Sequence, residues 1–279
     1  MLQLYKTNVI QGRFPNNELD LMPILSDGSD KEHILVLTYE SSDDLIALQL
    51  AKKAIDDNPG HTAKLLMPYV PYSRMDRAMP THMFTLKYLA RLINDLNFTK
   101  VVIYDPHSSA CQALLDRCVV HYPVQTFLHE NPVRSANYEN EYKDMLIPPP
   151  VRYDLLFYPD AGAIKKYSEL LPELPYIYGN KRRNLETGEI VSYELVGDYD
   201  LTGKRVLIVD DLCEGGRTFV EAAKLLRAAG AAVVELYVTH LMPSARNFYR
   251  SKGNGLLDEI HSEDTLNLIT YFLINEPKP

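Results

Sequence analysis

Two adjacent carboxylates, Asp210 and Asp211, end a mostly apolar run, 205–209, that is typical of a buried parallel strand. A short turn with Gly215 and Gly216 follows, and a helical pattern begins directly after it. Glycines let a ligand approach the main chain, and the first turn of a helix offers unpaired N–H groups to a phosphate. The carboxylates can accept hydrogen bonds from the vicinal hydroxyls of a sugar. The segment therefore indicates a sugar-phosphate site; the alternative is an ordinary strand-to-helix connection with solvated acids.

Short apolar runs alternate with amphipathic helical runs along the whole chain, which predicts an α/β fold with parallel sheets flanked by helices. The expected strands are 34–38, 63–67, 101–104, 155–158, 205–209 and 233–238. A helix that Ser41 or Ser42 could cap follows the first strand, and another runs through Leu86 and Ile93. A polar, proline-bearing stretch at about 129–150 interrupts the alternation. We therefore expect two domains, 1–133 and 134–279.

Further polar residues follow the predicted strands in both halves. Asp105 and His107 come after one strand and Asp160 after another. Ligands of open parallel sheets lie beyond the carboxyl ends of the strands, so the two halves are expected to present these loops to one shared cleft. At that position His107 and Asp160 could hold a divalent ion that bridges nucleotide phosphates. The other seven histidines are interpreted as surface or core residues.

Composition limits the classes of partner. The formal net charge of −8 argues against a surface that binds the nucleic-acid backbone. Three cysteines, Cys111, Cys118 and Cys213, show neither metal-ligand spacing nor a disulfide framework, which indicates a reducing compartment. No signal-peptide pattern and no apolar run long enough to span a bilayer is visible. We expect a cytoplasmic protein that binds no membrane.

The acidic and glycine-bearing segment resembles the phosphoribosyl pyrophosphate binding loop of the type I phosphoribosyltransferase fold. Four other segments resemble those of the ribose-phosphate pyrophosphokinase family, in the family's order and at about its spacing: 12–18, 68–77, 105–108 and 159–162. A fifth, 180–183, is similar to the mobile catalytic loop of that family. The resemblance covers nearly the whole chain and implies two phosphoribosyltransferase-like domains.

The resemblance implies a Mg²⁺-dependent transfer of the β,γ-diphosphoryl group of ATP to the anomeric hydroxyl of ribose 5-phosphate, which leaves AMP. The implied catalytic residues are Lys181, Arg183 and His107, and the implied metal residues are His107 and Asp160. ATP-binding positions by resemblance are Phe14, Asn16, Glu18, Arg74, Met75, Asp76 and Arg77. The sugar-phosphate positions are Asp210, Asp211, Glu214, Gly215, Gly216, Arg217 and Thr218. A neighbouring subunit of the family supplies part of the adenine pocket, so a homo-oligomer with a nucleotide site shared between subunits is also implied.

Several positions depart from the family pattern. Where the family usually has Asp-Thr-Gly-Gly-Thr, this chain has 214–218 with an arginine before the threonine. The planar guanidinium of Arg217 suits phosphate oxygens, so the acceptor could carry more phosphate than ribose 5-phosphate does. ADP-ribose is such an acceptor, and its 1-diphosphate could take up nicotinamide to rebuild NAD. The alternative is that Arg217 points to solvent. Met75, Asn16 and Pro106 replace glutamine, aspartate and leucine, which alters the groups expected near adenine and the aim of His107.

Two other classes of protein remain open. One is a catalytically silent homologue that binds and regulates an active synthetase, although such a regulator has no need of the full set of catalytic residues. The other is a plain phosphoribosyltransferase, which would leave the segment at 74–77 and the second domain unexplained.

Overall fold

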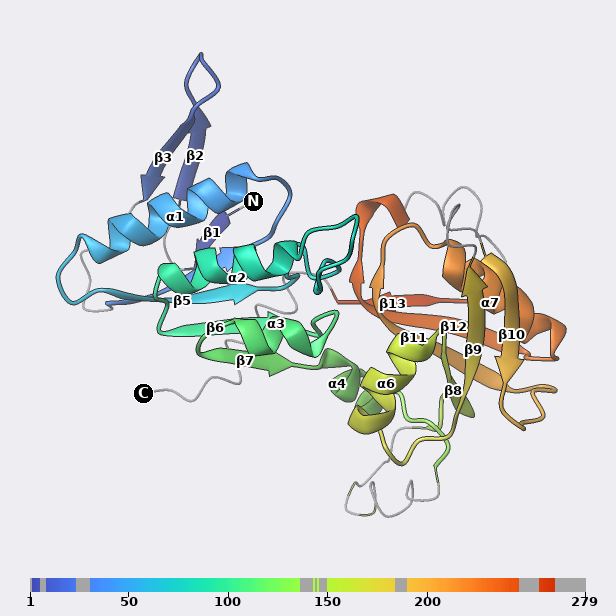
Figure 1. Ribbon diagram of the computed structural model, residues 1–279. Helices are drawn as coiled ribbons and strands as arrows, with labels where there is room; N and C mark the ends of the chain where they lie inside the picture. Colours follow the sequence, from blue (N-terminus) through green and yellow to red (C-terminus); the bar gives the residue numbers. More distant parts are fainter. Residues whose placement is uncertain are drawn as a thin grey trace. The chain divides into compact units, whose positions relative to one another are not determined.

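The computed structural model describes residues 2–5, 9–23, 31–135, 143, 145, 150–183, 190–245 and 256–263. The chain divides into two compact units, one within Met1–His121 and the other spanning Tyr122–Glu263 (Figure 1). The domain boundary expected at residue 133 stays a prediction, since the stretch 136–142 lies outside the described residues.

The first unit contains a five-stranded sheet with the order β1-β4-β5-β6-β7 (Figure 1). β1 is antiparallel to β4, and the other neighbours are parallel. The strands are β1 (Leu2–Tyr5), β4 (Glu32–Leu37), β5 (Thr62–Met67), β6 (Lys100–Tyr104) and β7 (Cys118–His121). The connecting helices are α1 (Asp43–Asp56), α2 (Thr85–Asp95) and α3 (Ser109–Leu114).

The apolar periodicity of these segments explains their packing. Leu35 and Leu65 lie on one face of the sheet and pack with Leu48 and Ile55 of α1 in one buried cluster. The start of α1 differs from the expectation, because neither Ser41 nor Ser42 caps it with a side chain. Instead Oδ2 of Asp44 accepts hydrogen bonds from the backbone N–H groups of Glu40 and Ser41, at 2.8 and 2.9 Å.

A separate two-stranded hairpin, β2 (Val9–Arg13) and β3 (Leu19–Pro23), projects beyond α1 in the first unit (Figure 1). Its tip, 14–18, is exposed. Asn17 has a positive φ of 72°, a turn conformation that asparagine tolerates better than most residues. The hairpin therefore holds Phe14, Asn16 and Glu18 at a protruding tip.

The second unit is a six-stranded sheet with the order β10-β9-β8-β11-β12-β13, in which only β10 and β9 are antiparallel neighbours. Its strands are β8 (Leu155–Tyr158), β9 (Tyr176–Arg183), β10 (Ile190–Val196), β11 (Arg205–Cys213), β12 (Val233–Leu241) and β13 (Ile260–Ser262). The helices whose bounds are described are α4 (Pro123–Glu130), α6 (Ala161–Leu170) and α7 (Arg217–Ala228).

Alternate residues of the central strands face two different helical layers. Phe157 and Ile208 belong to the buried cluster with α7, whereas Leu156 and Leu207 belong to the cluster with α4 and α6. After β8 the chain passes through α6 to β9 on one side, and after β11 it passes through α7 to β12 on the other. The sheet therefore has its topological switch point between β8 and β11, where ligands of such sheets bind.

All six predicted strands are present within a few residues of the expected bounds. β11 is longer than expected, because its parallel pairing with β12 continues to Cys213, so Asp210 and Asp211 lie inside the strand. The segment 180–183, expected in a loop, belongs instead to β9, since β10 pairs with it as far as Arg183. In the described part of the chain, every helix is too short or too polar to cross a membrane.

Candidate active site

Asp160 lies at the switch point of the second unit, directly after β8. It is the N-cap of α6, and its Oδ1 accepts hydrogen bonds from the N–H groups of Gly162 and Ala163 at 3.0 and 3.2 Å. Capping fixes the carboxylate and leaves Oδ2 directed away from the helix backbone. The sequence therefore positions one acidic oxygen at the carboxyl end of the sheet.

Lys181 reaches this carboxylate from the neighbouring strand β9. Its Nζ lies 3.3 Å from Oδ2 of Asp160, and its side chain is only 8% exposed whereas that of Asp160 is 42% exposed. The ammonium group is thus partly desolvated and its main charge partner stays accessible. The ammonium group of Lys181 can therefore exchange this carboxylate for an anionic group of a substrate with little reorganisation. Of the neighbouring cations, Arg182 and Arg183 have side chains outside the described residues.

Asp210 and Asp211 form the second acidic part of the site, on β11. Burial raises the pKa of Asp210 well above its ordinary value, and the negative charges of Asp211 and Asp160 raise it further. Oδ2 of Asp211 lies 4.0 Å from Nζ of Lys166 on α6, and both side chains are largely buried. The charges of Asp160 and Asp211 thus both act on Asp210, while Lys181 lies beside Asp160 and Lys166 beside Asp211.

The glycine turn after β11 has the geometry that the sequence predicts. Gly216 has a φ of 74°, which favours glycine, and it is the N-cap of α7. A Cβ added at Gly215 would meet no atom within 4 Å, so the main chain there is open to a ligand. The side-chain hydroxyl of Ser244 donates to the carbonyl of Glu214 at 2.5 Å and ties the turn to the segment after β12. Arg217 begins α7 and is exposed, and Thr218 is half-buried.

The first unit contains the remaining candidates. Asp105 is buried with a φ of 40°, and His107, which follows Pro106 at the end of β6, is exposed. After β5, Arg74 and Arg77 are exposed, while Met75 and Asp76 are half-buried, and the carbonyl of Met75 accepts from the N–H of Leu86 at 3.2 Å. This last bond ties the segment to α2.

The hairpin tip carries the three other nucleotide candidates. Phe14 is 50% exposed, and the side chain of Asn16 accepts a hydrogen bond from the N–H of Glu18 at 3.2 Å. Arg13 donates to the carbonyl of Asn17 at 2.8 Å and forms an ion pair with Asp43 of α1. The tip is thus ordered by its own hydrogen bonds and presents an aromatic ring to solvent.

Two residues of the site were missed by sequence reasoning. Lys166 occupies a helix position that looks like an ordinary solvated lysine. Tyr193 lies on β10 and donates its hydroxyl to the carbonyl of Pro159 at 3.0 Å. Burial raises its pKa far above the ordinary value, and the charges of Asp160 and Asp210 raise it further. The one available signal was Gly179, since a glycine inside a strand indicates the close approach of another group.

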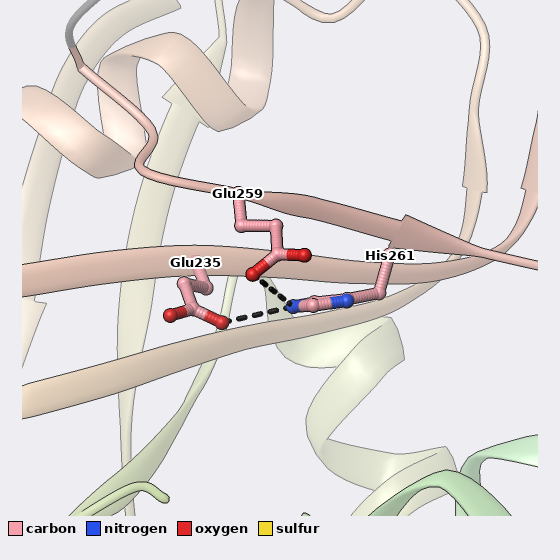
Figure 2. Close-up of side chains that lie close together, drawn as sticks. All are labelled: Glu235, Glu259 and His261. Carbon is pink, nitrogen blue, oxygen red and sulfur yellow. Dashed lines mark hydrogen bonds and ion pairs between the residues drawn. The ribbon is translucent and has the colours of Figure 1, made fainter.

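A second cluster of ionisable side chains lies at the amino ends of the strands of the second unit. Figure 2 shows Glu235 and Glu259 with their carboxylates directed toward the ring of His261, with ligand atoms within 4.8 Å of one another. Nη2 of Arg152 lies 3.0 Å from Oε2 of Glu235 and 2.6 Å from Oε2 of Glu259. The hydroxyl of Tyr153 donates to the same oxygen of Glu235 at 2.8 Å. The guanidinium of Arg152 already supplies the positive charge that a metal ion would bring to the two glutamates. We therefore interpret this cluster as a structural ion-pair network.

Comparison with known proteins agrees with this architecture. Residues 165–260 match the family model described as phosphoribosyl transferase domain. The ribose-phosphate pyrophosphokinase of Cereibacter sphaeroides is 29% identical over 217 residues, which are 76% of this chain and 60% of that protein. The chain thus spans less than two thirds of that relative. The ribose-phosphate pyrophosphokinase of a Marinomonas species is 26% identical over 94% of this chain and 79% of its own length.

A solved structure extends the comparison to both units. The phosphoribosylpyrophosphate synthetase of Mycobacterium smegmatis matches 96% of this chain and 90% of its own, with a TM-score of 0.67 and 19% identity. The fold and the acidic and glycine-bearing site define a protein of the phosphoribosyltransferase-fold class with two such domains, as predicted. Within that class the chain is similar to ribose-phosphate pyrophosphokinases, at 29% and 26% identity to the two relatives named above.

Proposed function

We propose that this chain is a diphosphokinase that transfers the β,γ-diphosphoryl group of ATP to the anomeric hydroxyl of ribose 5-phosphate, giving phosphoribosyl pyrophosphate and AMP. The observation that carries the proposal is the pairing of Lys181 with Asp160 beside Asp210, next to an open glycine turn at a topological switch point. The names of the relatives support the same chemistry. A catalytically silent regulator would not need a desolvated lysine at this place.

The sugar phosphate binds in the turn after β11. Its 5-phosphate takes the N–H groups at the start of α7, where Gly215 and Gly216 leave the main chain accessible. Asp210 and Asp211 accept hydrogen bonds from the ribose hydroxyls. This orientation directs the anomeric hydroxyl toward the carboxyl end of β8, where Asp160 and Lys181 lie.

Transfer of the diphosphoryl group depends on positioning and on neutralisation of charge. The anomeric oxygen attacks the β-phosphorus, and its hydroxyl proton is released to water. The bond from this phosphorus to the oxygen of the α-phosphate breaks, and AMP leaves. Negative charge grows on the departing oxygen and on the equatorial oxygens of the transferred group. Lys181 leaves Asp160 to neutralise that charge, and Arg183 is assigned the same role by resemblance. In the first unit Arg74, Asp76 and Arg77 are assigned to ATP.

The accessible carboxylate of Asp160 at the switch point supports a magnesium ion there. Oxygen ligands are those that Mg²⁺ prefers. Asp160 would hold it, and a metal role for His107 rests on the family resemblance alone. A bound Mg²⁺ supplies neutralisation of the ATP phosphates.

A second acceptor is favoured by one specific observation. Arg217 is exposed on the first turn of α7, beside the open position of Gly215. An acceptor whose 5-phosphate carries a further phosphate group could place it against this guanidinium. ADP-ribose has such a diphosphate and keeps a free anomeric hydroxyl. Its product would be ADP-ribose 1-diphosphate, which a nicotinamide-transferring enzyme could convert to NAD.

We also propose that the nucleotide site is completed by a neighbouring copy of the chain. The exposed ring of Phe14 on the projecting hairpin supports this arrangement. Light scattering on the purified protein tests it, since a monomer that turns over ATP at full rate would contradict it.

Competition between the two acceptors tests the proposed function. Purified protein is incubated with Mg²⁺, ATP and an equimolar mixture of ribose 5-phosphate and ADP-ribose, and the products are followed by mass spectrometry. AMP with phosphoribosyl pyrophosphate supports the first acceptor, and AMP with diphosphorylated ADP-ribose supports the second. A protein that forms no AMP with either acceptor, although it binds ATP, would be a silent homologue.

A further inference from the structure

Tyr193 connects the strand of Lys181 to the turn of Asp160. It stands on β10 as the cross-strand partner of Lys181, so both side chains leave the same face of the hairpin. Its hydroxyl donates to the carbonyl of Pro159, the residue before Asp160, at 3.0 Å. The phenol thus bridges the two elements whose side chains form the ion pair.

The chain leaves space for this bridge. A Cβ at Gly179 would come within 2.3 Å of Cε2 and 2.6 Å of the hydroxyl oxygen of Tyr193. Glycine at this place in β9 therefore lets the ring cross the strand. The ring also packs edge-on against Phe157 of β8, with the ring centroids 6.5 Å apart. Contacts with Pro159, Gly179 and Phe157 thus hold the ring of Tyr193 in place. Such a residue can fix the distance between β9 and the turn of Asp160.

The hydroxyl stays a hydrogen-bond donor over the working pH range. Burial raises the pKa of Tyr193, and the carboxylates of Asp160 and Asp210 raise it further, so the phenol does not ionise near neutral pH. A neutral donor close to the carboxylates of Asp160 and Asp210 adds no charge of its own. The bond to Pro159 therefore persists while the charges around it change.

We infer that Tyr193 is a positioning residue for the diphosphoryl transfer, which sets Lys181 against the turn of Asp160. This inference rests on the proposed function. Loss of the hydroxyl frees the hairpin to shift relative to the turn, and small misplacements of a catalytic group are costly to the rate. The variant Tyr193→Phe should lower kcat by about tenfold and leave the KM for ATP nearly unchanged.

A double-mutant cycle separates positioning from a general structural role. AMP formation is measured for the wild type, Tyr193→Phe, Lys181→Ala and the double variant. If Tyr193 acts through Lys181, the double variant is no slower than Lys181→Ala alone, because the group that it positions is already gone. Losses that multiply would overturn the inference, as would an unchanged kcat in Tyr193→Phe.

Two other tyrosines of the second unit provide matched controls. Tyr158 is buried, and its hydroxyl has no hydrogen-bond partner among the described residues, so Tyr158→Phe should keep both rate and stability. Tyr153→Phe loses a buried hydrogen bond to Glu235 and should lower the Tm without changing kcat. A fall in kcat in Tyr153→Phe as large as that in Tyr193→Phe would contradict positioning.

Hydrogen exchange tests the same link without catalysis. The amides at 179–181 in β9 should exchange faster in Tyr193→Phe than in Tyr158→Phe, and equal exchange would contradict the link. A wild-type protein that forms no AMP would overturn the proposed function, and the positioning role with it. A wild type that forms AMP beside an unaffected Tyr193→Phe would overturn only the positioning role.

Discussion

Nζ of Lys181 lies 3.3 Å from Oδ2 of Asp160, and the lysine is the more buried of the two side chains. The two residues are adjacent because β9 pairs with β8, and Asp160 follows the end of β8 as the cap of α6. The pair therefore places the partly desolvated ammonium group of Lys181 beside the solvent-accessible carboxylate of Asp160. If an anionic substrate binds the ammonium group of Lys181, the carboxylate of Asp160 is left free to bind a metal ion.

Lys181→Ala should lower kcat by about 10²–10³-fold, because it removes a preorganised charge from the transition state. The carboxylate of Asp160 is 42% exposed and can be solvated, so the free energy of unfolding should fall by only about 1 kcal/mol. Steady-state AMP formation and thermal unfolding measure the two effects. Lys224→Ala, which removes an exposed cation of α7, is the matched control. A rate equal to that of the wild type would exclude Lys181 from the chemistry.

Asp211→Asn should weaken binding of the sugar acceptor more than binding of ATP, because the carboxylate lies on the strand that leads into the phosphate turn. The KM values for the two substrates give the comparison, with the exposed Asp198→Asn as control. Equal weakening for both substrates would instead indicate a general role in metal binding or folding.

Asp210→Asn should stabilise the protein at neutral pH while it reduces acceptor binding. The pKa of Asp210 is raised in the folded state, so the folded state binds more protons than the unfolded state, and stability falls as the pH rises above about 4. Replacing the carboxylate removes this loss. We expect the Tm at pH 7 to rise by about 2–4 °C, the effect of about 1 kcal/mol in a domain of similar size. The gain should disappear near pH 3.5, and a gain independent of pH would contradict this explanation.

Glu235→Gln should make the protein less sensitive to acid. Burial alone would raise the pKa of Glu235, but hydrogen bonds from His261, Tyr153 and Arg152 outweigh burial and lower it. Its ionised form therefore stabilises the fold above about pH 4.3, and the contribution is lost as the pH falls through the lowered pKa.

The variant should lose about 1–3 kcal/mol of unfolding free energy at pH 7 and approach the wild type at pH 3. Denaturant unfolding at several pH values measures this difference. Glu221→Gln, from an exposed ion pair with Lys224, should show neither effect. Parallel pH profiles for Glu235→Gln and the wild type would contradict the assignment.

Arg217→Thr tests the choice of acceptor. If Arg217 binds a second phosphate group, the variant should lose about tenfold or more in kcat/KM for ADP-ribose and keep its kcat/KM for ribose 5-phosphate. Arg91→Thr in α2 is the control, because the side chain of Arg91 is 82% exposed and its ion pair with Asp95 is long, at 3.9 Å, and solvated. Arg227 is less suitable, because its pair with Asp258 is closer and less exposed. No change for either acceptor would mean that Arg217 faces solvent.

The alternation of apolar runs predicted most strands of the two sheets, because buried parallel strands need nearly continuous apolar residues. It did not predict the hairpin of β9 and β10. The register that brings Tyr193 opposite Lys181 arises from pairing between two strands. Apolar and polar residues do not alternate there strongly enough to predict the two strands. The segment 180–183 was assigned to a loop because it resembles the mobile catalytic loop of the family.

The site was partly predictable for a related reason. Asp160 could be placed because an acid after an apolar strand must lie at the carboxyl edge of the sheet. Asp210 and Asp211 were expected just after their strand and lie instead inside β11, near its end. The contact of Lys181 with Asp160, and that of Lys166 with Asp211, depend on how far each side chain reaches across the edge. Sequence spacing carries no such information, except at Gly179, where the missing side chain marks a close approach.

The fate of the β-phosphorus tests the central claim most directly. ATP labelled with ³²P at the β-position is incubated with Mg²⁺, the protein and its acceptor, and the labelled products are separated. The account predicts that the label moves to the 1-position of the sugar as part of a diphosphate, while the nucleotide product is unlabelled AMP. Label retained in ADP would show transfer of a single phosphoryl group and would contradict the account.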